Sequence, residues 1–139
     1  VLKRKVLSLY STISSSINGK HVTGVLVSSG NHSFIVASDD MSVGRELRKH
    51  GEYGSSELNR ILHIVSPSSS VIFVGAHIGA IAIPIAKHVD SCIFFEANPD
   101  TFKLLDANLY LNEIVNTKCH NIALGEKSGE INFLKNRLK

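Results

Sequence analysis

The chain has 139 residues, 43% of them hydrophobic, and a formal net charge of +3, as expected for one globular domain with its own core. No apolar run approaches the length of a membrane span, and no segment resembles a signal peptide. No aromatic residues interleave the basic residues near the two ends of the chain, so the composition also argues against a nucleic-acid-binding stripe.

The first 66 residues are expected to form a lead-in of short elements. Apolar residues at helical spacing predict an N-terminal helix; they are Leu2, Val6, Leu9, Ile13 and Ile17. Two β-rich runs, His21 to Val27 and Ser33 to Ala37, flank the sequence SSGNH and predict a β-hairpin.

Two short helices should follow the hairpin. Ser42 is a plausible N-cap for a helix over Val43 to His50, and Gly51 is a natural stop. The basic side chains of this helix are expected in solvent; they are Arg45, Arg48 and Lys49. A second apolar face, at spacing i, i+3, i+4, i+7, is formed by Leu58, Ile61, Leu62 and Val65.

The stretch from Val71 to Asn98 organises the rest of the chain. It reads as a buried parallel strand over Val71 to Val74, a glycine turn, a helix over Ile78 to Val89, and a second buried strand over Ser91 to Phe95 that ends in an acid, Glu96. This is half of a doubly wound nucleotide-binding fold, in which a ligand lies at the carboxyl ends of the strands.

The glycine pattern discriminates between cofactors. A dinucleotide fingerprint that starts at Gly75 would place His77 at the second glycine, where the backbone must approach a pyrophosphate. His77 therefore argues against NAD. S-adenosylmethionine (SAM) has no phosphate and needs less room, with Gly75 and Gly79 in the turn beneath it and Glu96 beside its ribose hydroxyls.

The C-terminal part should complete one edge of the sheet. Asn98, Pro99 and Asp100 are a strong helix start, and the helix should run to about Leu111. A third strand is expected over Thr117 to Ala123, and an antiparallel one over Glu130 to Leu134. We therefore expect an α/β fold, a Rossmann-like doubly wound sheet in the order 3-2-1 that is truncated after its third parallel strand. Residues 67–139 form the cofactor-binding half, and residues 1–66 form the helical and β-hairpin lead-in.

Metal and nucleophile sites are not expected. None of the seven histidines lies at metal-ligand spacing, and no Ser-His-acid arrangement stands out. Cys92 and Cys119 lack C-x-x-C spacing and fall in predicted strands, which indicates reduced core thiols in a cytoplasmic protein.

Three segments resemble the FkbM-type SAM-dependent methyltransferases: VIFVGAHIGAIAIPIAK, IFFEANPDTFKLLDANLYLN and NIALGEKSGEINF. The family pattern runs roughly D-V-G-A-N-x-G, F-E-P-N-P, a helix ending in N-x-x-x-N, and A-L-G. The chain departs from it at Phe73, where the family has Asp near the methionine end of the cofactor, and at His77, where it has Asn. The match covers about half of the chain, and the family continues with further strands.

The resemblance implies a class I methyltransferase that transfers a methyl group from SAM to a hydroxyl oxygen of a small molecule or glycan. Because the composition argues against nucleic-acid binding, no nucleic acid is expected as a partner. The cofactor-binding residues that it implies are Gly75, Ala76, His77, Gly79, Glu96, Ala97, Asn98, Ala123 and Leu124. It also places Tyr53 and Glu57 near the active cleft. The catalytic residues stay unassigned, because the sequence indicates no general base.

Two alternatives follow from the departures. Because Phe73 replaces a polar group with an apolar one, the chain could be a catalytically inactive binding or assembly module. A NAD-dependent dehydrogenase ranks third. The strand order leaves the Val71 strand with an unpaired edge, so we expect either self-association as a homo-oligomer or a longer chain that completes the sheet.

Overall fold

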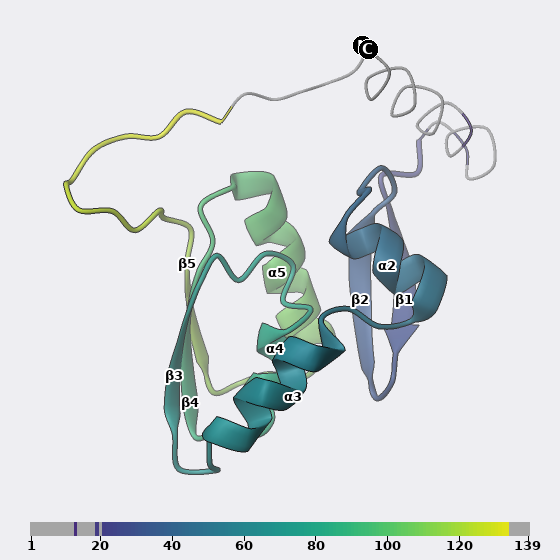
Figure 1. The fold of residues 1–139 in the computed structure, drawn as a ribbon. Helices are drawn as coiled ribbons and strands as arrows, with labels where there is room; N and C mark the ends of the chain where they lie inside the picture. The colour runs from purple at the N-terminus through teal and green to yellow at the C-terminus, as the bar shows by residue number, and fades with distance from the viewer. Residues whose placement is uncertain (1–12, 14–18, 20, 134–139) are drawn as a thin grey trace.

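The computed structural model describes residues 13, 19 and 21–133. Its elements in chain order are β1 (Gly24–Ser29), β2 (His32–Ala37), α2 (Val43–His50), α3 (Ser55–Ile64), β3 (Ser70–Val74), α4 (Ala82–Ala86), β4 (Ser91–Phe95), α5 (Pro99–Leu111) and β5 (Thr117–His120). Helix α5 lies between the sheet β3–β4–β5 and the hairpin β1–β2, on the side of strand β2, and α2 lies over one face of the hairpin (Figure 1). The predicted N-terminal helix lies outside the described residues except at Ile13.

The larger sheet is parallel, with strand order β3-β4-β5. This confirms the expected α/β fold and the order 3-2-1. Side chains alternate between the two faces of the sheet, as the pleat requires. Cys92 and Phe94 of β4 are buried on the face that packs on the helices, and the free thiol of Cys92 has its pKa raised by that burial.

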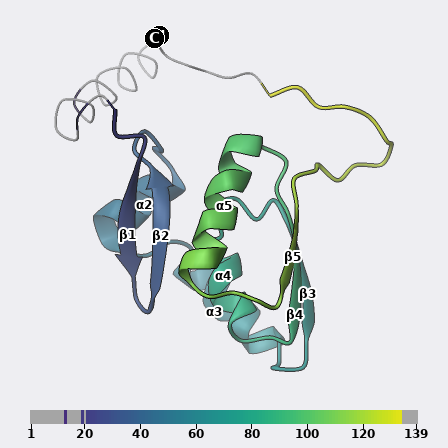
Figure 2. The same ribbon diagram turned by 180° about the vertical axis from the view of Figure 1, so that it is seen from behind.

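The opposite face of this sheet carries no helix among the described residues, as Figure 2 shows from behind. Ile72 and Val74 of β3 are 62% and 66% exposed on it. The prediction of a buried β3 is therefore wrong: Ile72 and Val74 are exposed, and Val71 and Phe73 are only half-buried. Parallel strands are buried on both faces only where elements cover both faces, and the described elements cover one.

The helix after the glycine turn is shorter than predicted. Residues 78–81 form turns, and α4 spans only Ala82–Ala86. Pro84 therefore lies in the first helical turn, where its missing N–H has no intrahelical acceptor to lose. The helix accordingly needs no kink at Pro84.

Asn108 of α5 and Asn112, which caps the end of this helix, fasten the hairpin to the rest of the molecule. Asn108 is fully buried; its Oδ1 accepts from the backbone N–H of Ile35 at 2.6 Å, and its Nδ2 donates to the carbonyls of Ile35 and Ile78. One turn later, the Asn112 amide makes the same pair of contacts with the backbone of Ser33. The side-chain amides thus satisfy the free edge of β2 much as a neighbouring strand would.

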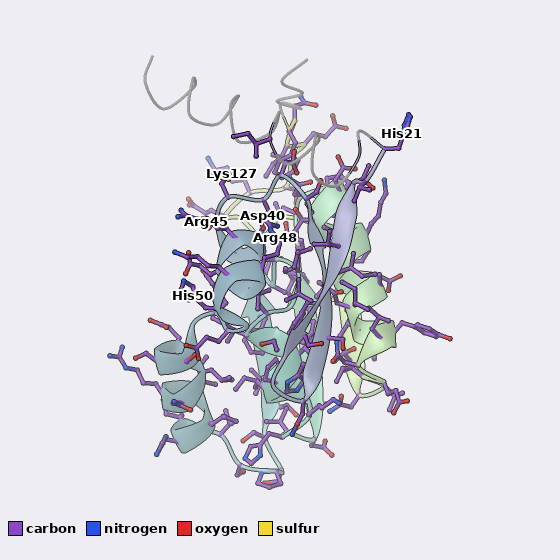
Figure 3. All side chains as sticks on the ribbon, turned by 90° about the vertical axis from the view of Figure 1, so that its right-hand side faces the viewer. His21, Asp40, Arg45, Arg48, His50 and Lys127 are labelled. Carbon is purple, nitrogen blue, oxygen red and sulfur yellow. The ribbon has the colours of Figure 1, made fainter. Side chains whose placement is uncertain are left out.

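The start of α2 differs in one detail from its prediction. The helix begins after Ser42, as expected, but Asp40 caps it: its carboxylate accepts from the N–H groups of Ser42 and Gly44. Arg48 is not simply solvated, because its guanidinium donates to the carbonyls of Ala37 and Asp40. Figure 3 shows Asp40 and Arg48 close together, whereas Arg45 lies at the surface of the helix.

The chain beyond β5 contains no regular element among the described residues. β5 ends at His120, three residues earlier than predicted, and residues 121–133 are exposed. The predicted strand over Glu130 to Leu134 is wrong for residues 130–133, because this exposed segment forms no ladder with β5. Among the helices that the structure describes, none is long and apolar enough to cross a membrane.

Candidate functional site

The glycine turn, residues 75–79, folds the chain across the carboxyl end of the neighbouring strand. The N–H groups of Gly75 and Ala76 both donate to the carbonyl of Phe95, the last residue of β4. Gly75, His77 and Gly79 all have positive φ, of 78°, 52° and 88°. A histidine there is strained, because a Cβ disfavours this region, so the turn is held by its contacts.

Glu96 provides the main contact that holds this turn. It is 8% exposed, and its two carboxylate oxygens accept from different segments: Oε2 from the N–H of His77 at 2.9 Å, and Oε1 from the N–H of Asn98 at 2.8 Å. These charge-assisted bonds offset the cost of burying the carboxylate. Since each carboxylate oxygen has two lone-pair sites, Glu96 retains capacity for further donors.

A cavity of about 540 Å³ opens beside the turn; we call it the turn cavity. Its walls are Ser42, Val43, Tyr53, Glu57, Ile61, Phe73, Gly75, Ala76, His77, Ala80, Ile81 and Ala82. The structure thus brings Tyr53 and Glu57 to the same cavity as Gly75, Ala76 and His77. Glu57 is the one carboxylate among these lining residues, and none of them is a lysine or arginine.

Phe73 forms part of the wall of the turn cavity, beside the residues expected at the methionine end of the cofactor. One feature of this cavity was not foreseen: the start of α2, through Ser42 and Val43, forms another part of the wall. No sequence pattern predicted that α2 would border this cavity, because the contact depends on how the hairpin docks on α5.

A second cavity, of about 750 Å³, lies beyond the end of β4; we call it the C-terminal cavity. Ala97, Ala123 and Leu124 line it, as does the rest of the exposed segment from Asn121 to Ile131. Asn121 ties this segment to β4, because its Nδ2 donates to the carbonyls of Glu96 and Ala97. No sequence pattern predicted a role for Asn121 at this site.

Three residues from the predicted set line neither cavity: Glu96, Asn98 and Gly79. Glu96 is instead bonded to the backbone of His77 and Asn98, as described above. Asn98 caps α5 instead: its Oδ1 accepts from the N–H groups of Asp100 and Thr101, which confirms the predicted N-cap. Gly79 faces the core, where an added Cβ would lie 2.7 Å from Ile83 Cδ1. The roles of Asn98 and Gly79 toward a cofactor stay predictions.

Glu96 connects the chain segments that line the two cavities. The carboxylate of Glu96 joins the turn beside one cavity to the start of α5 beside the other. No cluster of metal-binding side chains exists among the residues described.

Comparison with known proteins gives a family match over most of this region. The model of the TRM5/TYW2 methyltransferase domain matches residues 50–130. A search of curated protein sequences finds no match.

Solved structures of similar fold agree with the family match. They include the Methanocaldococcus jannaschii TYW2 in complex with AdoMet (21% identity, TM-score 0.59, covering 73% of this chain and 43% of that one). The M. jannaschii tRNA m1G37 methyltransferase has 20% identity and TM-score 0.56, with 75% and 31% covered. A complex of aTrm5 with tRNALeu has 19% identity and TM-score 0.56, with 70% and 27% covered. The chain thus spans less than half of each of these structures.

These matches overturn two expectations. The resemblance to the FkbM-type family is wrong, because the family model and the similar structures are of the TRM5/TYW2 type. The features that suggested it, a glycine turn and an acid after the second strand, are shared by nucleotide-binding folds in general. The expected small-molecule or glycan acceptor, without nucleic acid, is also wrong, because the similar structures are of tRNA methyltransferases, one with tRNA bound.

Proposed function

The chain belongs to the TRM5/TYW2 methyltransferase domain family, and from this premise we propose that it is the cofactor-binding part of a SAM-dependent tRNA methyltransferase. The observation that carries the proposal is Glu96, a buried carboxylate fixed between two cavities at the carboxyl edge of a parallel sheet. Ligands of open α/β sheets bind at this edge.

We assign the parts of the cofactor by the chemistry of each wall. Glu96 would accept hydrogen bonds from the ribose hydroxyls through its remaining lone pairs. Ala97, Ala123 and Leu124 would border the adenine in the C-terminal cavity, which is partly apolar. Gly75, Ala76 and His77 would border the methionine part in the turn cavity. Gly75 suits this place because an added Cβ would meet nothing within 4 Å, so the turn leaves open space above it.

The acceptor that we propose is a nucleobase of tRNA. Two similar solved structures are a tRNA m1G37 methyltransferase and a complex with tRNALeu. When bound, SAM supplies a methyl group on a positively charged sulfur. The chain's share is to exclude water and to align the nucleobase for an in-line displacement.

Glu57 is our candidate for the proton acceptor in this reaction. A ring nitrogen that carries a proton must lose it as the new N–C bond forms and the C–S bond breaks. Glu57 is the one carboxylate among the described residues that line the turn cavity, and positioned carboxylates serve as general bases. The lead-in, residues 1–66, thus supplies Tyr53 and Glu57, while residues 67–139 supply the turn and Glu96.

The test is transfer of tritium from methyl-labelled SAM to unmodified tRNA transcripts. We expect label in tRNA and none in added sugars or small alcohols. Glu57→Gln should lower the rate by about 10²- to 10⁴-fold, whereas Glu113→Gln, which removes an exposed carboxylate just beyond α5, should not change it. An unchanged rate in Glu57→Gln would reject the assigned base, and labelled glycan with unlabelled tRNA would reject the acceptor.

A further inference from the structure

The wall of the turn cavity that lies at the end of β3 is aromatic. Phe73 is the last residue but one of β3 and is half-buried. Its ring packs edge-to-face against the buried Phe94, with centroids 5.3 Å apart and planes at 90°. This contact fixes the orientation of the ring, because Phe94 is fully buried in the core. The part of Phe73 that the core leaves uncovered borders the cavity.

The other lining residues make the cavity suitable for a cation with an apolar body. Tyr53 and His77 add two further rings, and Glu57 adds a negative charge. Among the described lining residues, no lysine or arginine opposes a cationic ligand. Aromatic faces attract cations through the ring quadrupole, and the attraction grows when the site is dry.

We propose that Phe73, with Tyr53, holds the positively charged sulfur of SAM by cation–π attraction and so sets a preference for SAM over its neutral product, S-adenosylhomocysteine. This inference rests on the proposed function. A sulfonium is a cation with three apolar substituents. An aromatic wall therefore stabilises it without the desolvation cost that a buried carboxylate would carry.

The consequence for turnover is selective release of the product. S-adenosylhomocysteine has the same adenosine and amino-acid groups as SAM but an uncharged thioether. Contacts to Glu96 and to the C-terminal cavity would hold both molecules equally. The turn cavity, with Phe73, Tyr53 and Glu57 in its wall, would hold the charged molecule more tightly than the neutral one, so loss of the methyl group weakens binding there.

Calorimetric titration of the native chain with SAM and with S-adenosylhomocysteine tests this inference. We expect wild type to bind SAM at least about 3-fold more tightly than S-adenosylhomocysteine. Phe73→Leu keeps an apolar side chain but removes the ring; it should lower this ratio by about 3- to 10-fold, mainly through weaker SAM binding. Phe73→Tyr keeps a ring and should retain the preference. The control Tyr110→Leu, on an α5 side chain that is 86% exposed, should change neither affinity.

The outcomes separate this inference from the proposed function. If both ligands bind wild type equally, or if folded Phe73→Leu keeps the full ratio, the cation–π role is wrong while the cofactor proposal stands. If a folded wild-type sample binds neither ligand, both proposals are wrong. Because Phe73 also packs on Phe94, Phe73→Leu could unfold; equal binding of the two ligands by wild type would still reject the inference without that variant.

Discussion

The end of β4 and the neighbouring end of β3 differ in the groups that they present: polar groups at the end of β4, and a cavity with mainly apolar and small side chains at the end of β3. Glu96 bonds to two backbone N–H groups, and Asn121 bonds to two carbonyls. Beside them, Phe73 and the glycine turn present rings, small residues and an open cavity. The polar end has a fixed geometry before any ligand binds, so it suits hydroxyl recognition. The apolar end suits a group that needs a dry, complementary surface.

The largest loss of stability is expected from a substitution of Asn108, whose side chain bonds to the backbone next to the glycine turn. Its side chain bonds to the carbonyl of Ile78, next to the glycine turn, and to both backbone groups of Ile35. Asn108→Ala leaves these buried groups unpaired and should lower the free energy of unfolding by about 3–5 kcal/mol. Urea denaturation measures it, and Tyr110→Ala on the exposed side of α5 should stay within about 0.5 kcal/mol. If Asn108→Ala lowered the free energy of unfolding by no more than Tyr110→Ala does, the hairpin would not dock through Asn108.

Two glycines of the turn should respond differently to alanine. At Gly79 an added Cβ would lie 2.7 Å from Ile83 Cδ1 and 3.0 Å from Leu105 Cδ1, at φ +88°. At Gly75 it would meet nothing within 4 Å, although φ is +78°. We expect Gly79→Ala to cost about 3 kcal/mol through strain and overpacking, and Gly75→Ala about 1 kcal/mol through strain alone. Equal melting temperatures for the two variants would contradict this account.

A smaller loss of stability is expected when Glu96, at the end of β4, loses its charge. Glu96→Gln keeps the shape, but its amide offers only one acceptor oxygen to the N–H groups of His77 and Asn98. The free energy of unfolding should fall by about 1–2 kcal/mol. Hydrogen exchange should show the amide of His77 or of Asn98 losing protection while the core of α5 keeps it. Unchanged protection at both amides would mean that Glu96 does not hold the two loops together.

Much of the fold was predictable because local signals and burial agree. The β4 strand, the α5 start at Asn98 and the sheet order follow from apolar runs and capping chemistry, and the structure confirms them. The exposed face of β3 and the lack of a strand over residues 130–133 were not predictable. An apolar run does not say which elements are present to cover it or pair with it.

The parts of the candidate site that lie close together in the sequence were predictable. The parts that come from separate segments packing against each other were not. The turn and Glu96 lie in one strand–turn–helix–strand unit, so their proximity follows from the fold class. The contact of α2 with the cavity and the ties made by Asn121 depend on how separate segments pack. The family itself was misassigned, because the sequence signals that were used are common to many nucleotide-binding folds.

The central claim is that both strand ends bind one SAM molecule. A titration of the ¹⁵N-labelled chain with SAM, followed by amide chemical shifts, tests it most directly. We predict saturable shifts at Gly75, Ala76 and His77 and, in the same titration, at Ala97 and Ala123, with a dissociation constant in the micromolar range. Shifts at the β3 end without shifts at the β4 end, or no shifts at millimolar SAM in a folded sample, would contradict the account.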